Sequence, residues 1–153
     1  MTPHFASPGD DYLRRIGELA YAVSSLEWTL LGDLHRLSAT LPATLTVSEL
    51  AGATTGRIAR QLRQGAALAT APEVATYLIA GGDALAEVAE LRNAVLHARP
   101  TTIDGEQRLY RWRSQPAEAY AISDDWFDDA LARVAKLARQ VNAARPSFDA
   151  YPA

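Results

Sequence analysis

The stretch that decides the fold is DDYLRRIGELAYAVSSLEWTLLGDLHRL, residues Asp10 to Leu37. Its apolar residues recur at three- and four-residue spacing, the period of a helix with one face against a core. We predict one helix of about 28 residues, about 42 Å long, with Asp10 or Asp11 as its N-cap. A helix of this length favours a helical bundle. The apolar positions that set the period are Ile16, Leu19, Val23, Leu26, Leu30 and Leu37.

A shorter helix is predicted next, from about Thr46 to about Leu68. Thr46 and Glu49 have the spacing of a capping box, in which each side chain accepts a hydrogen bond from the backbone of the other residue. Three glycines inside this segment make its ends harder to place.

The following segment begins at Pro72, a residue that suits the first position of a helix. Gly81-Gly82 is expected to interrupt it, and Asp83 is expected to cap the helix that continues from there. Pro100 should end that helix by about Arg99, because the residue before a proline disfavours helical backbone angles.

From Thr101 to Arg113 the pattern changes to that of strands, and Asp104-Gly105 is a strong two-residue turn signal. We predict a small β-hairpin there, followed by a last helix from Ser123 to about Ala144. The predicted fold class is therefore all-α, an up-and-down bundle of four to five helices with one hairpin near 101–113. Residues 10–144 would form a single domain, between a flexible N-terminus (1–9) and an irregular C-terminal tail (145–153).

Composition excludes several kinds of chemistry. The chain has 153 residues and no cysteine, so disulfides, thiol nucleophiles and cysteine-bound zinc are ruled out. Its three histidines lie far apart and no carboxylate cluster has metal spacing, so we expect neither a metal nor another cofactor. There is no signal peptide and no apolar run of membrane length, which predicts a cytoplasmic protein without a membrane partner. The formal net charge of −3 argues mildly against nucleic acid, although local clusters matter more.

The predicted helix before Pro100 carries polar residues in the sequence LRNAVLHARP, which begins at Leu91. At 100° per residue, Asn93 and His97 lie about 140° and about 180° from a core stripe that runs through Val88. Arg92 starts beside that stripe, but its long side chain can reach the polar side. An amide, an imidazole and a permanent cation can therefore meet on one anion.

Phosphodiester cleavage needs such groups. A guanidinium forks onto two phosphate oxygens and stabilises charge that builds at phosphorus. An imidazole can exchange a proton with a ribose 2′-hydroxyl or with the leaving oxygen near neutral pH. Cleavage without metal requires both a base and an acid, so a symmetric homodimer would have to supply the second imidazole.

Arg92-Asn93-Ala94-Val95-Leu96-His97 resembles the Rx4–6H signature of the HEPN superfamily, small helical bundles that commonly dimerise. Many members are metal-independent endoribonucleases. The resemblance implies that Arg92, Asn93 and His97 cleave RNA and leave a cyclic phosphate. It also implies host defence or toxin–antitoxin biology, with an antitoxin-like partner. One toxin branch has a tyrosine two residues after the histidine, where this chain has Arg99, so regulation through that tyrosine is in doubt.

Further arginines are candidate RNA contacts. Arg57, Arg60 and Arg63 follow one another at three-residue spacing, which fits either a solvated basic face or a track for phosphates. Residues 92–113 carry five arginines against two acids. The candidates in and beside the hairpin are Arg99, Arg111 and Arg113. The intervening Tyr110 and Trp112 can stack on bases, but we expect them to pack the hairpin onto the bundle.

Two carboxylates are predicted to support the motif side chains without contacting the RNA themselves. Glu27 is a lone acid among apolar residues and could pair with Arg92 or His97, or be exposed; Glu90 lies on the polar side of the motif helix. Taken singly, His97 also fits an ordinary helix end and Arg92 a surface cation. Two other functions stay open: an inactive HEPN-like dimeric scaffold, and an unrelated bundle in which Arg92 and Glu27 form a structural ion pair.

Overall fold

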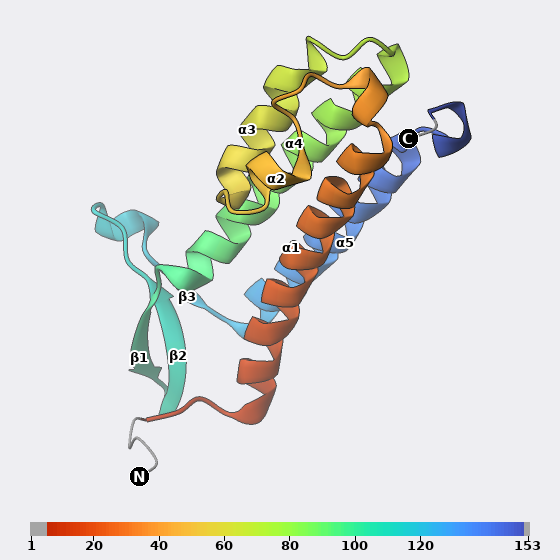
Figure 1. The fold of residues 1–153 in the computed structure, drawn as a ribbon. Helices are drawn as coiled ribbons and strands as arrows, with labels where there is room; N and C mark the ends of the chain where they lie inside the picture. Colours follow the sequence, from red (N-terminus) through yellow and green to blue (C-terminus); the bar gives the residue numbers. More distant parts are fainter. Residues whose placement is uncertain (1–5, 152–153) are drawn as a thin grey trace.

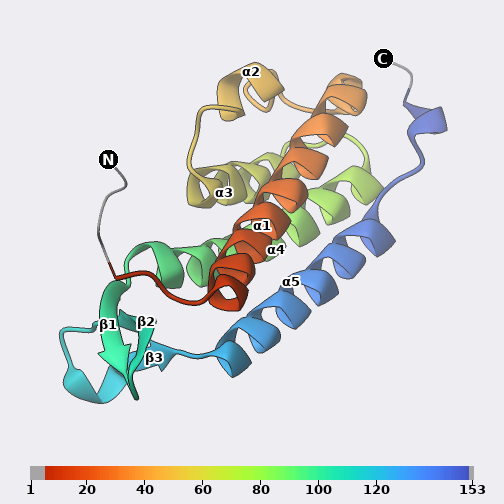
Figure 2. The same ribbon diagram turned by 90° about the horizontal axis from the view of Figure 1, so that it is seen from below.

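The computed structural model describes residues 6–151. Within this range the chain forms five α-helices and one three-stranded antiparallel sheet, so the predicted mostly helical fold with a small β element is confirmed (Figure 1). Three long helices, α1 (Asp10–Arg36), α4 (Pro72–Leu96) and α5 (Asp124–Ala144), pack together, and the short α2 (Val47–Leu50) and α3 (Thr55–Ala66) cover part of α1 and α4. Figure 2 shows the sheet at one end of the long helices and the last described turn at the other.

Helix α1 confirms the long helix expected from the first stretch, with 27 residues. Leu19, Val23 and Leu30 on its inner face are almost fully buried. The predicted cap is wrong: Gly9 occupies the N-cap without a side-chain hydrogen bond, and Asp10 and Asp11 belong to the first turn. Acidic side chains in that turn still stabilise the helix, because its N-terminal end carries partial positive charge.

The single helix predicted from Thr46 to Leu68 is wrong, because the chain makes two. The Thr46 hydroxyl accepts a hydrogen bond from the Glu49 amide at 3.3 Å, but α2 ends after four residues. The Thr54 hydroxyl then accepts from the Arg57 amide at 3.3 Å and starts α3. A second capping residue so soon after Gly52 gives the chain a new helix start in a new direction.

Helix α4 runs without interruption through Gly81 and Gly82, contrary to the predicted break at these residues. A Cβ at Gly81 would lie 2.5 Å from the Leu30 side chain, and one at Gly82 would lie 2.9 Å from the backbone oxygen of Ala59. The two glycines therefore let α1 and α3 approach α4 closely. Asp83 does not cap a helix but pairs with Arg63 at 2.7 Å.

The hairpin is formed by β1 (Arg99–Ile103) and β2 (Glu106–Arg111), as predicted. Asp104 and Gly105 both have positive φ, 52° and 80°, as a tight two-residue hairpin turn requires. A third strand, β3 (Tyr120–Ile122), was not predicted, because three residues are too few to show an alternating pattern.

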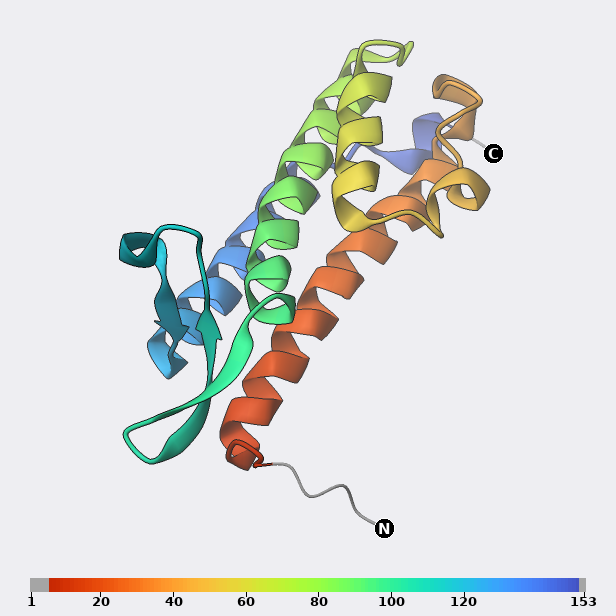
Figure 3. The same cartoon turned by 90° about the vertical axis from the view of Figure 1, so that its left-hand side faces the viewer.

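Tyr12 near the start of α1 fastens the sheet to the helices. Its hydroxyl donates to the Ile122 carbonyl at 2.7 Å and accepts from the Leu109 amide at 2.9 Å. Its ring meets Phe127 of α5 edge-on, with 5.3 Å between centroids. The hairpin is thereby held beside the first turns of α1, just beyond the end of α4 (Figure 3).

The segment after α5 was predicted to be irregular; within residues 145–151 it has little regular structure, but it packs against the bundle. After α5, Arg145 donates to both carboxylate oxygens of Asp33, at 2.8 and 2.5 Å, and its guanidinium lies 4.9 Å from the Phe148 ring. Phe148–Ala150 forms a short 3-10 helix. The Tyr77 hydroxyl also donates to Asp33. Burial, followed by this hydrogen bond, raises the pKa of Tyr77, and the bond to Asp33 raises the pKa of Arg145.

Asp33→Ala should lower the free energy of unfolding by about 3 kcal/mol, because it leaves the buried Tyr77 hydroxyl and the Arg145 guanidinium without their acceptor. The midpoint of thermal unfolding should fall by about 6–12 °C for a domain of this size. Asp83→Ala is the matched control: Asp83 is 61% exposed and pairs with the exposed Arg63, so its loss should cost below about 1 kcal/mol. Equal midpoints for the two variants would contradict this role of Asp33.

No helix within residues 6–151 is long and apolar enough to cross a membrane.

Candidate functional site

The motif residues lie at the end of α4. Arg92 and Asn93 are half-buried in its last turns, whereas His97 follows the helix as its C-cap and is exposed. The helix ends at Leu96, somewhat earlier than predicted, because the chain turns there into β1. His97 is thus available to a ligand, and Arg92 is rooted against the bundle.

A chain of hydrogen bonds holds the Arg92 guanidinium. Its Nη1 donates to the Thr55 hydroxyl at 2.7 Å, and this hydroxyl donates to Glu27 Oε2 at 2.6 Å. Its Nη2 lies 3.5 Å from the Asn93 side-chain oxygen. Arg92 Nε is buried and has no hydrogen-bond partner among residues 6–151. The cation is therefore held by three elements, α1, α3 and α4, with part of its donor capacity unused.

Thr55 is the residue of this network that the sequence did not single out. It is the first residue of α3 and only 1% exposed, and it bridges Glu27 and Arg92. The sequence does contain a signal for Thr55, the pair Thr54-Thr55. Only one of the two hydroxyls is needed to cap the helix, so the other is free for another contact. Neither alternative for Glu27, direct pairing with Arg92 or His97 or full exposure, is found: Glu27 is half-buried and is linked to Arg92 through the Thr55 bridge. The same bridge would also serve an arginine with a purely structural role.

Glu90 does not join the network. Its side chain is exposed, and within the described part of the chain it makes no hydrogen bond or ion pair with Arg92, Asn93 or His97. The structure therefore gives Glu90 no supporting contact with the motif.

The sheet carries cationic and aromatic groups to the same end of α4. Arg111 Nη1 donates to the His97 carbonyl at 3.1 Å. The Arg99 guanidinium lies 4.9 Å from the Trp112 ring and 5.7 Å from the Tyr110 ring. Trp112 is 55% exposed, so the expectation that it packs the hairpin onto the bundle is wrong. Arg113, the next residue, is exposed as well.

The three arginines of α3 differ in their surroundings. Arg63 is engaged by Asp83, whereas Arg57 and Arg60 are exposed and make no ion pair within residues 6–151. Arg57 lies two residues from Thr55 and is thus the nearest of the three along the chain to the Arg92 network. Arg60 and Arg63 follow farther along α3, so the structure does not bring the whole row to the motif.

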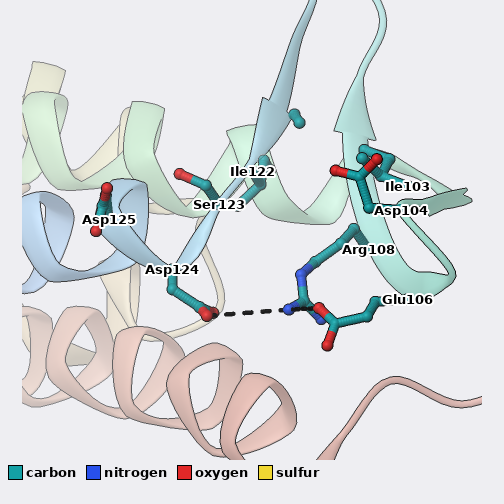
Figure 4. Close-up of a pocket in the computed structure, with 9 residues that line it drawn as sticks. Ile103, Asp104, Glu106, Arg108, Ile122, Ser123, Asp124 and Asp125 are labelled. Atoms are coloured by element: carbon teal, nitrogen blue, oxygen red, sulfur yellow. Dashed lines mark hydrogen bonds and ion pairs between the residues drawn. The ribbon is translucent and has the colours of Figure 1, made fainter.

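Cavities near the motif are small. The space between α1 and the Arg92 side of α4 measures about 30 Å³, too little for a nucleotide. A larger hollow of about 360 Å³ lies between the β1–β2 turn and the start of α5, and Figure 4 shows Asp124 facing Arg108 across it. Its carboxylates would repel a phosphate, and no group of three or more potential metal ligands occurs in the part of the chain that the structure describes. Any phosphate site at the motif is therefore on the surface.

Fold and site together define a helical bundle with a terminal sheet; the arginine, asparagine and histidine of the motif lie at the α4 end that meets this sheet. No protein-family model matches the chain, and neither a curated protein nor a solved structure matches it. What the cluster does must therefore be argued from its own residues.

Proposed function

We propose that this chain is a HEPN-type endoribonuclease that cleaves single-stranded RNA without a metal. The observation that carries the proposal is the Arg92 guanidinium, held by Thr55 and by Asn93 in the same helix end that presents the exposed His97. Placing a held cation and an exposed imidazole on one helix end is an arrangement that can serve phosphodiester cleavage. It is also the arrangement expected from the Rx4–6H resemblance.

The reaction is a transesterification. The ribose 2′-oxygen attacks the neighbouring phosphorus, its proton passes to one imidazole, and the bond from phosphorus to the 5′-oxygen breaks. A second imidazole gives a proton to that leaving oxygen. The products are a 2′,3′-cyclic phosphate and a 5′-hydroxyl. Arg92 stabilises the charge that builds on the phosphate oxygens, and Asn93 holds the guanidinium.

Two imidazoles require two chains, so the proposed enzyme is a homodimer with its two motif regions facing each other. Leu96 supports this: it lies between Arg92 and His97 in the sequence and is 65% exposed. Leu13 at the start of α1 is 44% exposed. In such a dimer the exposed Leu96 would be covered together with the motif. The cytoplasmic toxin or defence role and the antitoxin-like partner rest on the family resemblance alone.

The test is cleavage of a fluorescently labelled single-stranded oligoribonucleotide in excess EDTA. We expect cleavage to continue at the rate measured without EDTA, because no step uses a metal. Sedimentation under the same conditions should show a dimer. Activity that disappears in EDTA and returns with Mg²⁺ would contradict the proposal. Binding of the RNA without scission would instead favour the inactive dimeric scaffold.

A further inference from the structure

The end of the hairpin nearest α4 carries an exposed tryptophan that the proposed chemistry does not use. Trp112 directly follows β2 and is 55% exposed, which is unusual for the largest apolar side chain. The Arg99 guanidinium lies 4.9 Å from its ring. Arginine over an aromatic ring gives a cation–π contact.

Trp112 is tied to the motif through its neighbour. Arg111 donates to the His97 carbonyl at 3.1 Å, so the strand that ends in Trp112 is fixed to the end of α4. Arg99 pairs with Tyr110 across the hairpin, only two residues after His97 in the sequence. Trp112 and His97 therefore belong to the same junction of the sheet with α4, and an RNA strand bound at His97 would pass along this junction.

The two ends of the hairpin differ in charge. Arg99, Arg111 and Arg113 gather at the α4 end and form no ion pair within residues 6–151. Glu106 lies opposite Ile103, four residue steps from Arg99 in the strand register and so about 13 Å away, and Asp104 in the turn is one step farther along the chain. A polyanion is drawn to the α4 end and repelled from the turn.

We infer that Trp112, with Arg99 beside it, is a stacking platform for one unpaired base of the RNA that is cut at His97. The ring supplies the stacking surface, and the arginines contact the adjoining phosphates. Because every base has a π-face, such a platform selects unpaired over paired RNA without demanding a particular sequence. This inference rests on the proposed function and specifies its substrate class: single-stranded RNA with a splayed base.

The test measures binding of a short labelled oligouridylate by fluorescence anisotropy, in a His97→Ala background in which cleavage should be at least about 100-fold slower. Trp112→Ala should weaken binding about 5- to 150-fold, the loss expected for one stacked base. Trp112→Phe should retain most of the affinity, because it keeps an aromatic face. Trp28→Ala is the matched control: Trp28 is 52% exposed but lies on α1, so binding should not change.

A second probe separates stacking from charge. An oligomer of the same length without bases should bind Trp112→Ala and its Trp112 parent equally, because only the phosphates remain to be contacted. If Trp112→Ala and Trp28→Ala bind oligouridylate as tightly as the parent, the platform is overturned. The platform is also overturned if Trp112→Ala weakens binding of the oligomer without bases as much as it weakens binding of oligouridylate.

The inference and the proposed function fail in different ways. If the wild-type chain cleaves RNA and Trp112→Ala cleaves it with unchanged KM and kcat, the platform is wrong and the ribonuclease stands. If Trp112 governs binding but the wild-type chain never cuts, the platform stands and the catalytic proposal is wrong. A chain that binds no oligoribonucleotide overturns both.

Discussion

Replacing His97 with alanine should slow RNA cleavage by about 10²- to 10⁴-fold, the usual contribution of a general acid or base. In the proposed dimer the change removes both imidazoles, so proton transfer at the 2′-oxygen and at the leaving oxygen is lost together. Folding should be preserved, because His97 is exposed and its contacts to α4 and β2 are made by its backbone amide and carbonyl. Initial rates in EDTA, with the circular dichroism of both proteins, measure this.

His35→Ala is the control for this variant. His35 is also exposed but belongs to the last turn of α1, among residues that make no contact with the Arg92 network. It should cleave RNA at the wild-type rate. If the His97→Ala protein is folded and fully active, the His97 imidazole takes no part in the cleavage.

Arg92→Lys should lower the cleavage rate by about 10²- to 10³-fold, although it keeps the positive charge. The guanidinium donates to Thr55 from one nitrogen and lies near Asn93 with another, and a compact ammonium cannot keep that position while it binds a phosphate. The Glu27–Thr55 hydrogen bond does not involve Arg92 and should persist. Single-turnover rates on saturating RNA isolate the effect on the chemical step.

Arg92→Lys also separates the proposed role from a structural one. If Arg92 serves only to link α3 and α4 to Glu27, the lysine variant should lose thermal stability and yet, where folded, should cleave RNA at the wild-type rate. Arg139→Lys on the exposed face of α5 is the matched control, and neither rate nor stability should change.

The helices could be predicted from the sequence where a local signal was strong. The apolar period of α1, the Asp104-Gly105 turn and Ser123 as the cap of α5 all correspond to what the structure contains. These features depend on neighbouring residues alone. The arginine, asparagine and histidine of the motif were likewise chosen from their spacing on one helix.

The sequence predictions fail where contacts between segments far apart in the chain determine the local structure. Gly81-Gly82 predicts a break in the helix, but α1 and α3 pack so closely on α4 there that a side chain would not fit. The sequence of the tail does not reveal that Arg145 binds the buried Asp33, which lies 112 residues earlier. Thr55 and the exposure of Trp112 likewise depend on how α3 and the sheet meet α4. Such contacts between distant segments cannot be predicted from the local pattern of a single sequence.

The central claim is that Arg92 and His97 cleave RNA by attack of the 2′-hydroxyl, without metal. Chemical analysis of the RNA ends formed in EDTA, by the wild-type chain and by His97→Ala in parallel, tests it most directly. The claim predicts 2′,3′-cyclic phosphate and 5′-hydroxyl ends from the wild-type chain, formed at least about 100-fold more slowly by the variant. Ends that carry a 3′-hydroxyl, or cyclic ends formed equally fast by both proteins, would contradict it.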